Sequence, residues 1–313
     1  MHLKKRQFLA LACIILILLL YRCVDVSKFE QTEAPQMVAI AQVDLSGIPV
    51  KNQVSADPQL NATAAFVTDE DSGAILFSKN ANTLYAPAST TKLMTALVAR
   101  KLYKSGSVVT VKLTRPVGGT ILGLKLGEQY SLDSLLEAAL IPSANDAAEV
   151  LAENHPDGVA GFVEDMNALA KELDLQNTHF SNPSGFDASD HHSTARDLDI
   201  LAREVLKDPV LRRIVATKDT QIKDIMGKRV FSLKNTNRLL GEDPRVEGVK
   251  TGTTEEAGEV LITLINDGKR KLLLVVLGSS SRYTDTQTLI DWVGANYTWY
   301  SPDELLKRSE ASE

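Results

Sequence analysis

The spacing of hydrophobic and polar residues changes along the chain, and each spacing predicts a different kind of element. Two short apolar runs within residues 64–78 surround an Asp-Ser-Gly turn, which predicts a β-hairpin. In residues 91–103 the apolar positions recur at helical spacing, after a plausible helix start at Pro87-Ala88-Ser89. Further helical patterns occupy residues 131–152, 159–173 and 194–206. The fold is therefore expected to open with strands and to continue through a mainly helical middle.

The last third of the sequence has a different character. Three runs there are rich in Val, Ile, Leu and Thr, namely residues 246–253, 260–265 and 272–277. Gly258 and Asp267-Gly268 separate these runs, so they predict strands that are joined by turns. A closing helix is expected around residues 289–293, and residues 298–313 are expected to form a polar tail without a core contribution.

The first 24 residues have the layout of an export signal. Basic residues at positions 4–6 precede an uncharged apolar stretch, residues 8–21. Because clustered Lys and Arg stay in the cytoplasm, the rest of the chain is expected outside it, in a periplasmic or extracellular position. No small-residue cleavage pattern follows directly, so residues 1–24 are interpreted as an uncleaved membrane anchor. The stretch is short for a membrane span, which leaves cleavage and secretion open.

Residues 25–59 show no sustained hydrophobic period and predict a linker between this anchor and a folded domain, residues 60–297. The only cysteines, Cys13 and Cys23, lie in or beside the apolar stretch, so no disulfide is expected in the folded part. A lipoprotein signal is disfavoured, because Arg22 precedes Cys23 where a small residue is needed.

Composition is that of an ordinary folded protein. Of the 313 residues 44% are hydrophobic and 24% charged, enough for one large core or two smaller ones. The formal net charge is -6. A nucleic-acid partner is not expected, because neutralising phosphates requires a basic surface.

The start of the first long helix carries the first candidate chemistry. Ser89 and Lys92 stand at positions i and i+3, which lie on the same helix face about 5–6 Å apart. A serine hydroxyl is a weak nucleophile unless a neighbouring base takes its proton, and a lysine whose charge is disfavoured by burial can be that base. This spacing alone is also common in a helix cap followed by a surface lysine.

Two further motifs follow in order. Ser143 and Asn145 come after a turn-forming Pro142, and Lys250-Thr251-Gly252 lies on a predicted strand. The set S-x-x-K, S-x-N and K-T-G is the signature of penicillin-binding proteins and related β-lactamases. The chain resembles the low-molecular-weight penicillin-binding proteins that are serine D-alanyl-D-alanine carboxypeptidases. The resemblance covers residues 60–297, with extended matches at residues 85–96, 143–148, 162–167 and 249–258.

The resemblance implies a fold and a place for the site. The fold would be an α/β (α+β) sandwich of the β-lactamase/transpeptidase type, an antiparallel sheet flanked by helices. A mainly helical lobe would be inserted between the first-motif helix and the third-motif strand, and the active site would lie in the cleft between sheet and lobe.

The resemblance also implies a role for each motif residue. Ser89 would attack the penultimate D-alanine carbonyl while Lys92 takes its proton. Ser143, with Lys250 nearby, would relay a proton to the leaving D-alanine, and Asn145 would orient the substrate amide and Lys92.

The backbone N–H groups of Ser89 and Thr253 would form the oxyanion hole, a kind of donor that contributes about 100–1,000-fold in rate. Substrate binding would involve Lys250, and Thr251 would contact the terminal carboxylate. Gly252 would let the strand approach. Arg282 is the candidate second carboxylate partner, since its guanidinium suits bidentate binding, although an exposed surface arginine is an equal reading.

No cofactor is expected, and no metal. His179, His191 and His192 lack the spacing of known metal motifs and are interpreted as surface or loop histidines. The implied partners are the peptidoglycan stem peptide, β-lactam antibiotics as covalent inhibitors, and the membrane through the N-terminal segment.

Three alternatives share parts of the pattern. A D,D-endopeptidase that cuts peptidoglycan cross-links uses the same motifs. A class A β-lactamase would need an E-x-x-L-N arrangement, and residues 164–167 are one residue too short for it. A catalytically silent cell-wall sensor would keep the fold, but the intact motifs disfavour it. Ala144 inside the second motif is a small change, and the C-terminal all-β domain of the larger relatives has no counterpart in the sequence.

Overall fold

The computed structural model of the protein describes residues 47–52, 55–112 and 116–310. The chain divides into two compact units, Met1–Asp44 and Leu45–Glu313, and all the elements described below belong to the second. The expected anchor and most of the expected linker lie outside the described residues. Within the described ranges, no helix combines the length and apolar character that crossing a bilayer requires.

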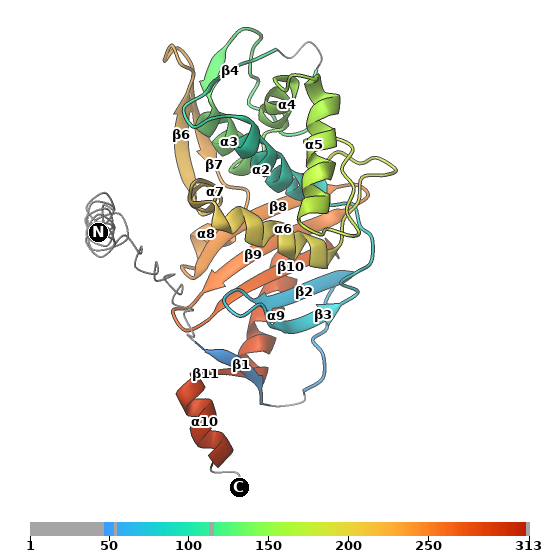
Figure 1. Ribbon diagram of the computed structural model, residues 1–313, viewed down its shortest axis with the longest axis vertical. Coiled ribbons are helices and arrows are strands. Elements are labelled where there is room, and N and C mark those ends of the chain that lie inside the picture. Colours follow the sequence, from blue (N-terminus) through green and yellow to red (C-terminus); the bar gives the residue numbers. More distant parts are fainter. Residues whose placement is uncertain (1–46, 53–54, 113–115, 311–313) are drawn as a thin grey trace, which may run out of the picture. The chain divides into compact units, whose positions relative to one another are not determined.

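A five-stranded sheet organises the domain, with the strand order β3-β2-β10-β9-β8 and antiparallel pairing throughout (Figure 1). Its strands are β2 (Ala64–Asp69), β3 (Ile75–Lys79), β8 (Val246–Thr254), β9 (Gly258–Asn266) and β10 (Lys271–Ser279). The N-terminal hairpin and the three C-terminal strands predicted from the sequence are confirmed. The sheet joins the two ends of the domain's sequence, so strands β2 and β10 pair across 200 residues of intervening chain.

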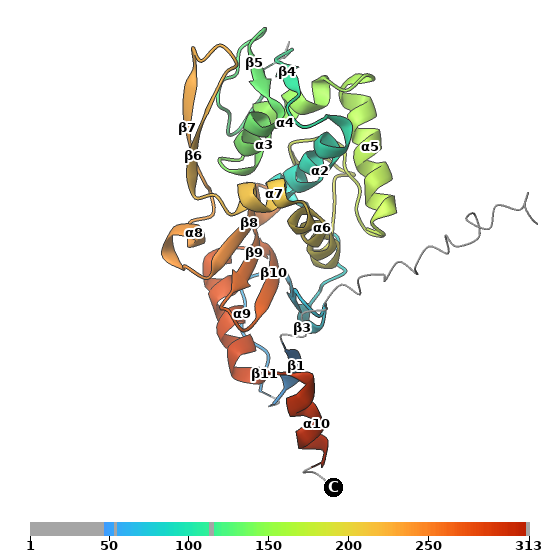
Figure 2. The same cartoon turned by 60° about the vertical axis from the view of Figure 1, so that its left-hand side comes forward.

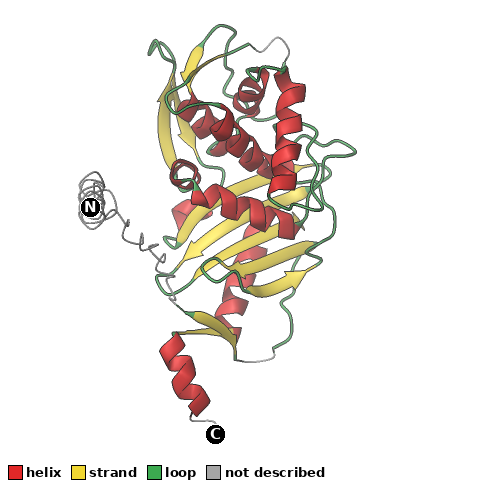
Figure 3. Cartoon of the chain, viewed as in Figure 1, coloured by secondary structure: helices red, strands yellow, loops and turns green. Residues whose placement is uncertain are grey.

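Both faces of this sheet are covered by helices. Along β10, Leu273 and Val275 face one hydrophobic cluster, while Leu272 and Leu274 face another. Helix α6 (Ala195–Lys207) packs on the first face and α9 (Arg282–Asn296) on the second (Figures 1 and 3). Burying such a side chain contributes about 1.5–3 kcal/mol, so the double-sided core explains the continuous apolar runs of the central strands.

A helical lobe follows the first hairpin. It contains the short 3₁₀ helix η2 (Ala88–Thr91), α2 (Lys92–Leu102), α3 (Leu132–Leu140), α4 (Asn145–Glu153) and α5 (Gly158–Glu172), with a small sheet of β4 (Val108–Thr110) and β5 (Gln129–Ser131). The helical pattern over residues 131–152 is broken between α3 and α4. The break occurs because Pro142 has no N–H to continue the helix and Ser143 has a φ of 65°.

Several elements were not predicted. Asp208-Pro209 ends α6 as expected, but it also begins α7 (Pro209–Val215), with the Asp208 carboxylate accepting from two N–H groups of the new helix. A hairpin of β6 (Asp219–Lys223) and β7 (Val230–Lys234) runs beside α3, as Figure 2 shows, and α8 (Leu239–Glu242) follows it.

The expectation of a polar tail over residues 298–313 was wrong in its first part. Strand β11 (Tyr297–Tyr300) pairs antiparallel with β1 (Ile48–Lys51), and helix α10 (Pro302–Glu310) follows. Trp299 packs against the cluster behind the sheet and donates its Nε1–H to Asp69 at 2.8 Å. The folded unit therefore begins inside the expected linker and extends past residue 297.

Candidate active site

Ser89 and Lys92 are in direct contact at the start of the helical lobe. The Lys92 Nζ donates to Ser89 Oγ at 2.9 Å and to the Ser184 carbonyl at 2.6 Å. Ser89 lies in η2 and Lys92 opens α2, so the three-residue spacing places the amine beside the hydroxyl. Ala88, just before the serine, has a φ of 49°, an uncommon conformation for a residue with a side chain. The first motif thus places a serine hydroxyl against a lysine amine on a strained turn.

Burial makes the Lys92 amine a usable base. The side chain is completely buried, and this desolvation lowers its pKa to about 7, against the opposing effect of the Glu149 carboxylate. A substantial fraction of the amine is therefore uncharged at neutral pH. An uncharged amine that is bonded to a hydroxyl can take its proton.

The second motif lies at the N-terminus of α4. Ser143 has a left-handed backbone, and its buried Oγ has no hydrogen-bond partner among the described residues. The Asn145 side chain donates to the Gly118 carbonyl at 2.9 Å, and its backbone N–H donates to the Thr120 carbonyl at 2.7 Å. The Ser143 hydroxyl is therefore unpaired within the described residues, while the loop before β5 holds Asn145 in place.

Asp146 fixes the same loop. Its carboxylate accepts from the backbone N–H groups of Leu122, Gly123 and Leu124 at 2.8 to 3.1 Å. Charge-assisted bonds of this kind are about twice as strong as neutral ones. The residue that follows Asn145 thus anchors the segment to which Asn145 donates.

The third motif lies on strand β8, directly against Ser89. A Cβ atom on Gly252 would lie 2.9 Å from the Ser89 nitrogen, which is closer than real side chains allow. Thr253 follows Gly252 on the same strand. The expectation that a glycine permits this approach agrees with the geometry.

Lys250 is the second buried lysine of the site. Its Nζ donates to the Thr251 carbonyl at 3.1 Å. Desolvation, with the positive charges of Lys92 and Arg282, lowers its pKa well below the ordinary value. The Thr251 hydroxyl shares a 2.6 Å hydrogen bond with the hydroxyl of Thr236, which precedes β8 in the sequence.

Arg282, at the start of α9, reaches the third motif as well. Its Nη1 donates to the Gly252 carbonyl at 2.9 Å and to Thr253 Oγ1 at 2.8 Å. Its Nε is buried and has no hydrogen-bond partner among the described residues. A guanidinium with an unused donor therefore stands beside the strand along which the substrate is expected to lie.

The sequence analysis missed the segment that supports Lys92 from the other side. Asn182 Oδ1 accepts from the N–H groups of Ser184, Gly185 and Phe186. Gly185 has a φ of 87°, and a Cβ there would lie 1.9 Å from the Ala88 carbonyl oxygen. The Asn-Pro-Ser-Gly run at residues 182–185 was the available signal, since it is typical of a tight turn.

The described residues contain no group of three His, Cys, Asp or Glu side chains that could hold an ion. His191 lies in a loop, one of the two positions expected for it, and its side chain is buried. Its Nδ1 accepts from the Ser181 N–H at 2.9 Å, and its Nε2 lies 2.8 Å from Thr91 Oγ1. Burial lowers its pKa to about 4, so it is neutral at physiological pH and supports the turn before α2.

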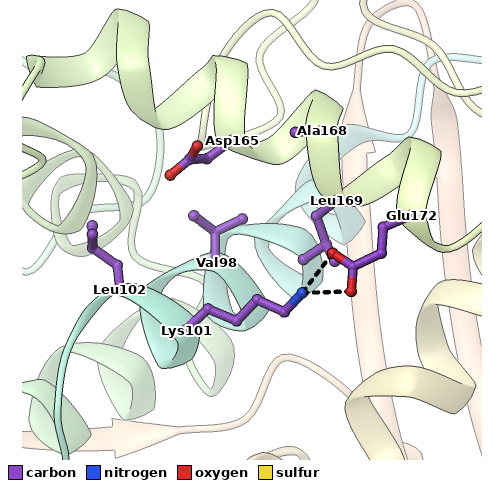
Figure 4. Close-up of a pocket in the computed structure, with 7 residues that line it drawn as sticks. All are labelled: Val98, Lys101, Leu102, Asp165, Ala168, Leu169 and Glu172. Carbon is purple, nitrogen blue, oxygen red and sulfur yellow. Dashed lines mark hydrogen bonds and ion pairs between the residues drawn. The ribbon is translucent and has the colours of Figure 1, made fainter.

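A hollow between α2 and α5 lies apart from this chemistry (Figure 4). Lys101 and Glu172 form an ion pair across it. Its lining residues are Val98, Lys101, Leu102, Asp165, Ala168, Leu169 and Glu172. None of them belongs to the three motifs, so we do not assign the reaction to this hollow.

Two solved structures show which fold this is. The Streptomyces K15 DD-transpeptidase is 29% identical, with a TM-score of 0.72, and the match covers 77% of this chain and all of that one. A penicillin-binding protein homolog from Mycobacterium tuberculosis is 30% identical, with a TM-score of 0.73 over 78% of this chain and 95% of that one. The α/β fold is therefore that of the β-lactamases and transpeptidases, as expected.

Sequence relatives agree. The D-alanyl-D-alanine carboxypeptidase DacF of Bacillus subtilis is 34% identical over 80% of this chain and 65% of its own length, so this chain spans just under two thirds of that relative. A D-alanyl-D-alanine endopeptidase of Pseudomonas aeruginosa is 32% identical over 82% of this chain and 84% of its own length. The family model described as D-alanyl-D-alanine carboxypeptidase matches residues 51–281. The chain therefore belongs to the D-alanyl-D-alanine carboxypeptidase family of serine hydrolases.

Proposed function

We propose that this protein is a D-alanyl-D-alanine carboxypeptidase that removes the terminal D-alanine from peptidoglycan pentapeptides through an acyl-enzyme on Ser89. The observation that supports this most directly is the contact between the Ser89 hydroxyl and the buried Lys92 amine, 2.9 Å apart and beside strand β8. β-Lactams would acylate the same hydroxyl. The N-terminal segment would hold the enzyme at the membrane, on the side where peptidoglycan lies.

In the acylation step, the neutral Lys92 amine takes the Ser89 proton as Ser89 Oγ attacks the penultimate D-alanine carbonyl. The negative charge that develops on the carbonyl oxygen is stabilised by the N–H groups of Ser89 and Thr253. Such preorganised donors lower the barrier because they need no reorientation when the charge forms.

Collapse of the tetrahedral intermediate breaks the peptide bond, and the departing amine must gain a proton. Ser143 Oγ, which has no partner among the described residues, would pass the proton taken up by Lys92 to the departing amine with the help of Lys250, so that Lys92 is neutral again. Water then attacks the Ser89 ester and Lys92 accepts a proton from it. Lys92 returns this proton to Ser89 Oγ as the ester bond breaks, and the shortened peptide leaves with the Ser89 hydroxyl restored.

The terminal carboxylate of the substrate is recognised from the third motif. Thr251 would offer its hydroxyl, Arg282 reaches the following residues of β8 with its guanidinium, and Lys250 adds an amine from the same strand. Two donors in a fixed geometry discriminate a carboxylate from an amide, since a buried donor left without its acceptor is costly.

A D,D-endopeptidase is the second candidate. The chain covers 84% of the length of the Pseudomonas aeruginosa endopeptidase but only 65% of the Bacillus subtilis carboxypeptidase. Both reactions attack a bond that follows a D-alanine, and they differ in whether the leaving group is free D-alanine or a second stem peptide.

The test compares both substrates with the full-length chain. D-Alanine release from a peptide ending in Lys-D-Ala-D-Ala and cleavage of a D,D-cross-linked muropeptide dimer are measured side by side. The controls are Ser89→Ala and penicillin-treated enzyme. D-Alanine release that disappears in both controls supports the carboxypeptidase proposal, whereas cleavage of the dimer alone, with the same controls, points to the endopeptidase. No reaction of either kind despite penicillin labelling of Ser89 would contradict both.

A further inference from the structure

Helix α4 carries a buried carboxylate that the proposed reaction does not use. Glu149 lies one turn after Asn145 and is only 2% exposed. Its Oε1 accepts a 2.9 Å hydrogen bond from the hydroxyl of Ser184. Burying an ionised carboxylate is costly unless it has partners of opposite charge or strong donors. Its position therefore calls for an explanation in terms of what it faces.

Ser184 connects this carboxylate to the base of the reaction. Its hydroxyl donates to Glu149, and its carbonyl accepts the 2.6 Å hydrogen bond from Lys92 Nζ. The turn around it is rigid, because Asn182 accepts three backbone N–H groups there and Thr95 donates to the Pro183 carbonyl at 2.6 Å. A displacement of the Ser184 hydroxyl would therefore be felt at the amine that contacts Ser89.

Glu149 also acts on Lys92 through its charge. Helices α2 and α4 lie side by side in the lobe (Figures 1 and 2). The carboxylate favours the protonated amine and opposes the effect of burial. Lys92 also interacts through its charge with Lys250 of β8, and Arg282 interacts with Lys250 in the same way. His191, which bonds the neighbouring Thr91, is uncharged at neutral pH.

We propose that Glu149, acting through Ser184, is a positioning residue of the reaction, which holds the Lys92 amine against Ser89. Its negative charge would also shift the pH at which that amine begins to act as a base, against the larger effect of burial. The inference rests on the proposed roles of Ser89 and Lys92. It assigns no contact with the substrate to Glu149.

The charge has a second consequence within the acylation step. When Lys92 takes the Ser89 proton, a positive charge forms in a buried site that already faces Lys250. A carboxylate in the same site stabilises that charge as it forms, so Glu149 lowers the barrier to proton transfer as well as setting the pH range.

The experiment measures the rate of Ser89 acylation by a fluorescent penicillin between pH 5 and pH 9 (roughly the range around a pKa near 7) in the full-length chain. The variants are Glu149→Gln, which removes the charge but keeps the shape, and Glu149→Asp, which keeps the charge. Glu153→Gln is the matched control, because it makes the same change one turn further along α4.

Glu149→Gln is expected to move the midpoint of the acidic limb to lower pH by about one unit, since an opposite charge within a few ångströms shifts a pKa by about that much or more. Glu149→Asp and Glu153→Gln should keep the wild-type midpoint. A rate that falls equally at every pH, with an unmoved midpoint, would mean that Glu149 serves packing alone, and the proposal would be wrong.

Ser184→Ala provides a second route if Glu149→Gln does not fold. It keeps the carbonyl that accepts from Lys92 and removes the donor to Glu149. The plateau rate above the midpoint is expected to fall about tenfold, the effect of one lost buried hydrogen bond. A wild-type plateau would overturn the proposal. Loss of penicillin labelling in Ser89→Ala, run alongside, separates these outcomes from failure of the proposed nucleophile.

Discussion

The candidate site contains two buried lysines, and they differ in the charged groups that act on them. Lys92, on the lobe side, bonds a hydroxyl and a carbonyl and feels the Glu149 carboxylate, so its pKa falls only to about 7. Lys250, on the sheet side, feels the positive charges of Lys92 and Arg282, and its pKa falls well below the ordinary value. Burial therefore lowers the pKa of both amines, but a neighbouring carboxylate opposes the fall only at Lys92, while neighbouring cations add to it at Lys250.

The largest change in acylation rate is expected when the Lys92 amine is removed. Lys92→Met keeps the buried volume but has no base, so acylation by penicillin should slow about a thousandfold. Stopped-flow fluorescence measures this rate, and Lys101→Met on the same helix is the control. A loss smaller than tenfold would show that another group deprotonates Ser89.

The same variant should be more stable than the wild type. The folded chain holds Lys92 at a pKa near 7, while the unfolded chain holds it at its ordinary value of 10.5. Between these pH values the unfolded state binds more protons, so wild-type stability rises with pH through this window and is lowest below it. At pH 7 and below, Lys92→Met should therefore raise the melting temperature, on the order of several degrees. Scanning calorimetry at pH 6 and pH 9 checks the sign, because the gain should be smaller at pH 9.

On the sheet side of the site, the close approach of the β8 backbone to Ser89 is expected to affect the rate more than charge does. Gly252→Ala places a Cβ atom 2.9 Å from the Ser89 nitrogen, so the strand must move away from the nucleophile. A displacement of about 1 Å commonly costs about a hundredfold in rate. Acylation kinetics test this, with Gly294→Ala in α9 as the comparison variant. Unchanged kinetics in Gly252→Ala would mean that β8 does not position the reacting carbonyl.

Lys250 should take up a proton more readily when an anion binds, because the anion opposes the effects that lower its pKa. A substrate carboxylate beside it favours the charged amine, so binding should take up as much as roughly one proton. Calorimetry of penicillin binding to Ser89→Ala, in two buffers with different ionisation enthalpies, detects that uptake. It should disappear when Lys250→Met is added. Equal binding enthalpies in both buffers would contradict the assignment.

The smallest effect is expected at a lysine that is not buried. Lys101 and Glu172 pair at 2.8 Å, but their side chains are 57% and 66% exposed. Exposed pairs contribute about 0–1 kcal/mol, so Lys101→Ala should change the free energy of unfolding by less than about 1 kcal/mol. Urea denaturation measures it, and a larger loss would show that the hollow of Figure 4 contributes more to stability than its exposure implies.

The sequence predicted those elements of the fold in which apolar residues recur at a regular spacing. The strands around Leu273 and the helix after Lys92 follow from apolar spacing, because burial on one or both faces imposes that spacing. Strand β1 could not be found this way. It has four residues, one of them Pro49, and its partner Trp299 lies 250 residues away.

The candidate site divides along a similar line. Side chains that act through their own chemistry, such as Ser89 and Lys250, stand in motifs of fixed spacing and were predicted. Ser184 contacts Lys92 through its backbone carbonyl, which any residue could supply, and its hydroxyl reaches Glu149 only through tertiary packing, so no local motif identifies it. The position of Glu149 near Lys92 depends on which face of α4 packs against α2, and only tertiary packing determines that face.

The pairing of β1 with β11 has a topological consequence. Ile48 lies opposite Tyr300. The first and the last strand of the described chain are therefore hydrogen-bonded neighbours, and the start of one lies beside the end of the other. In such an arrangement, the positions at which the chain begins and ends do not affect which side chains meet in the active site. A circularly permuted chain, joined between these strands and opened at the exposed turn around Gly268, should therefore keep the same nucleophile, base and strand edge in place.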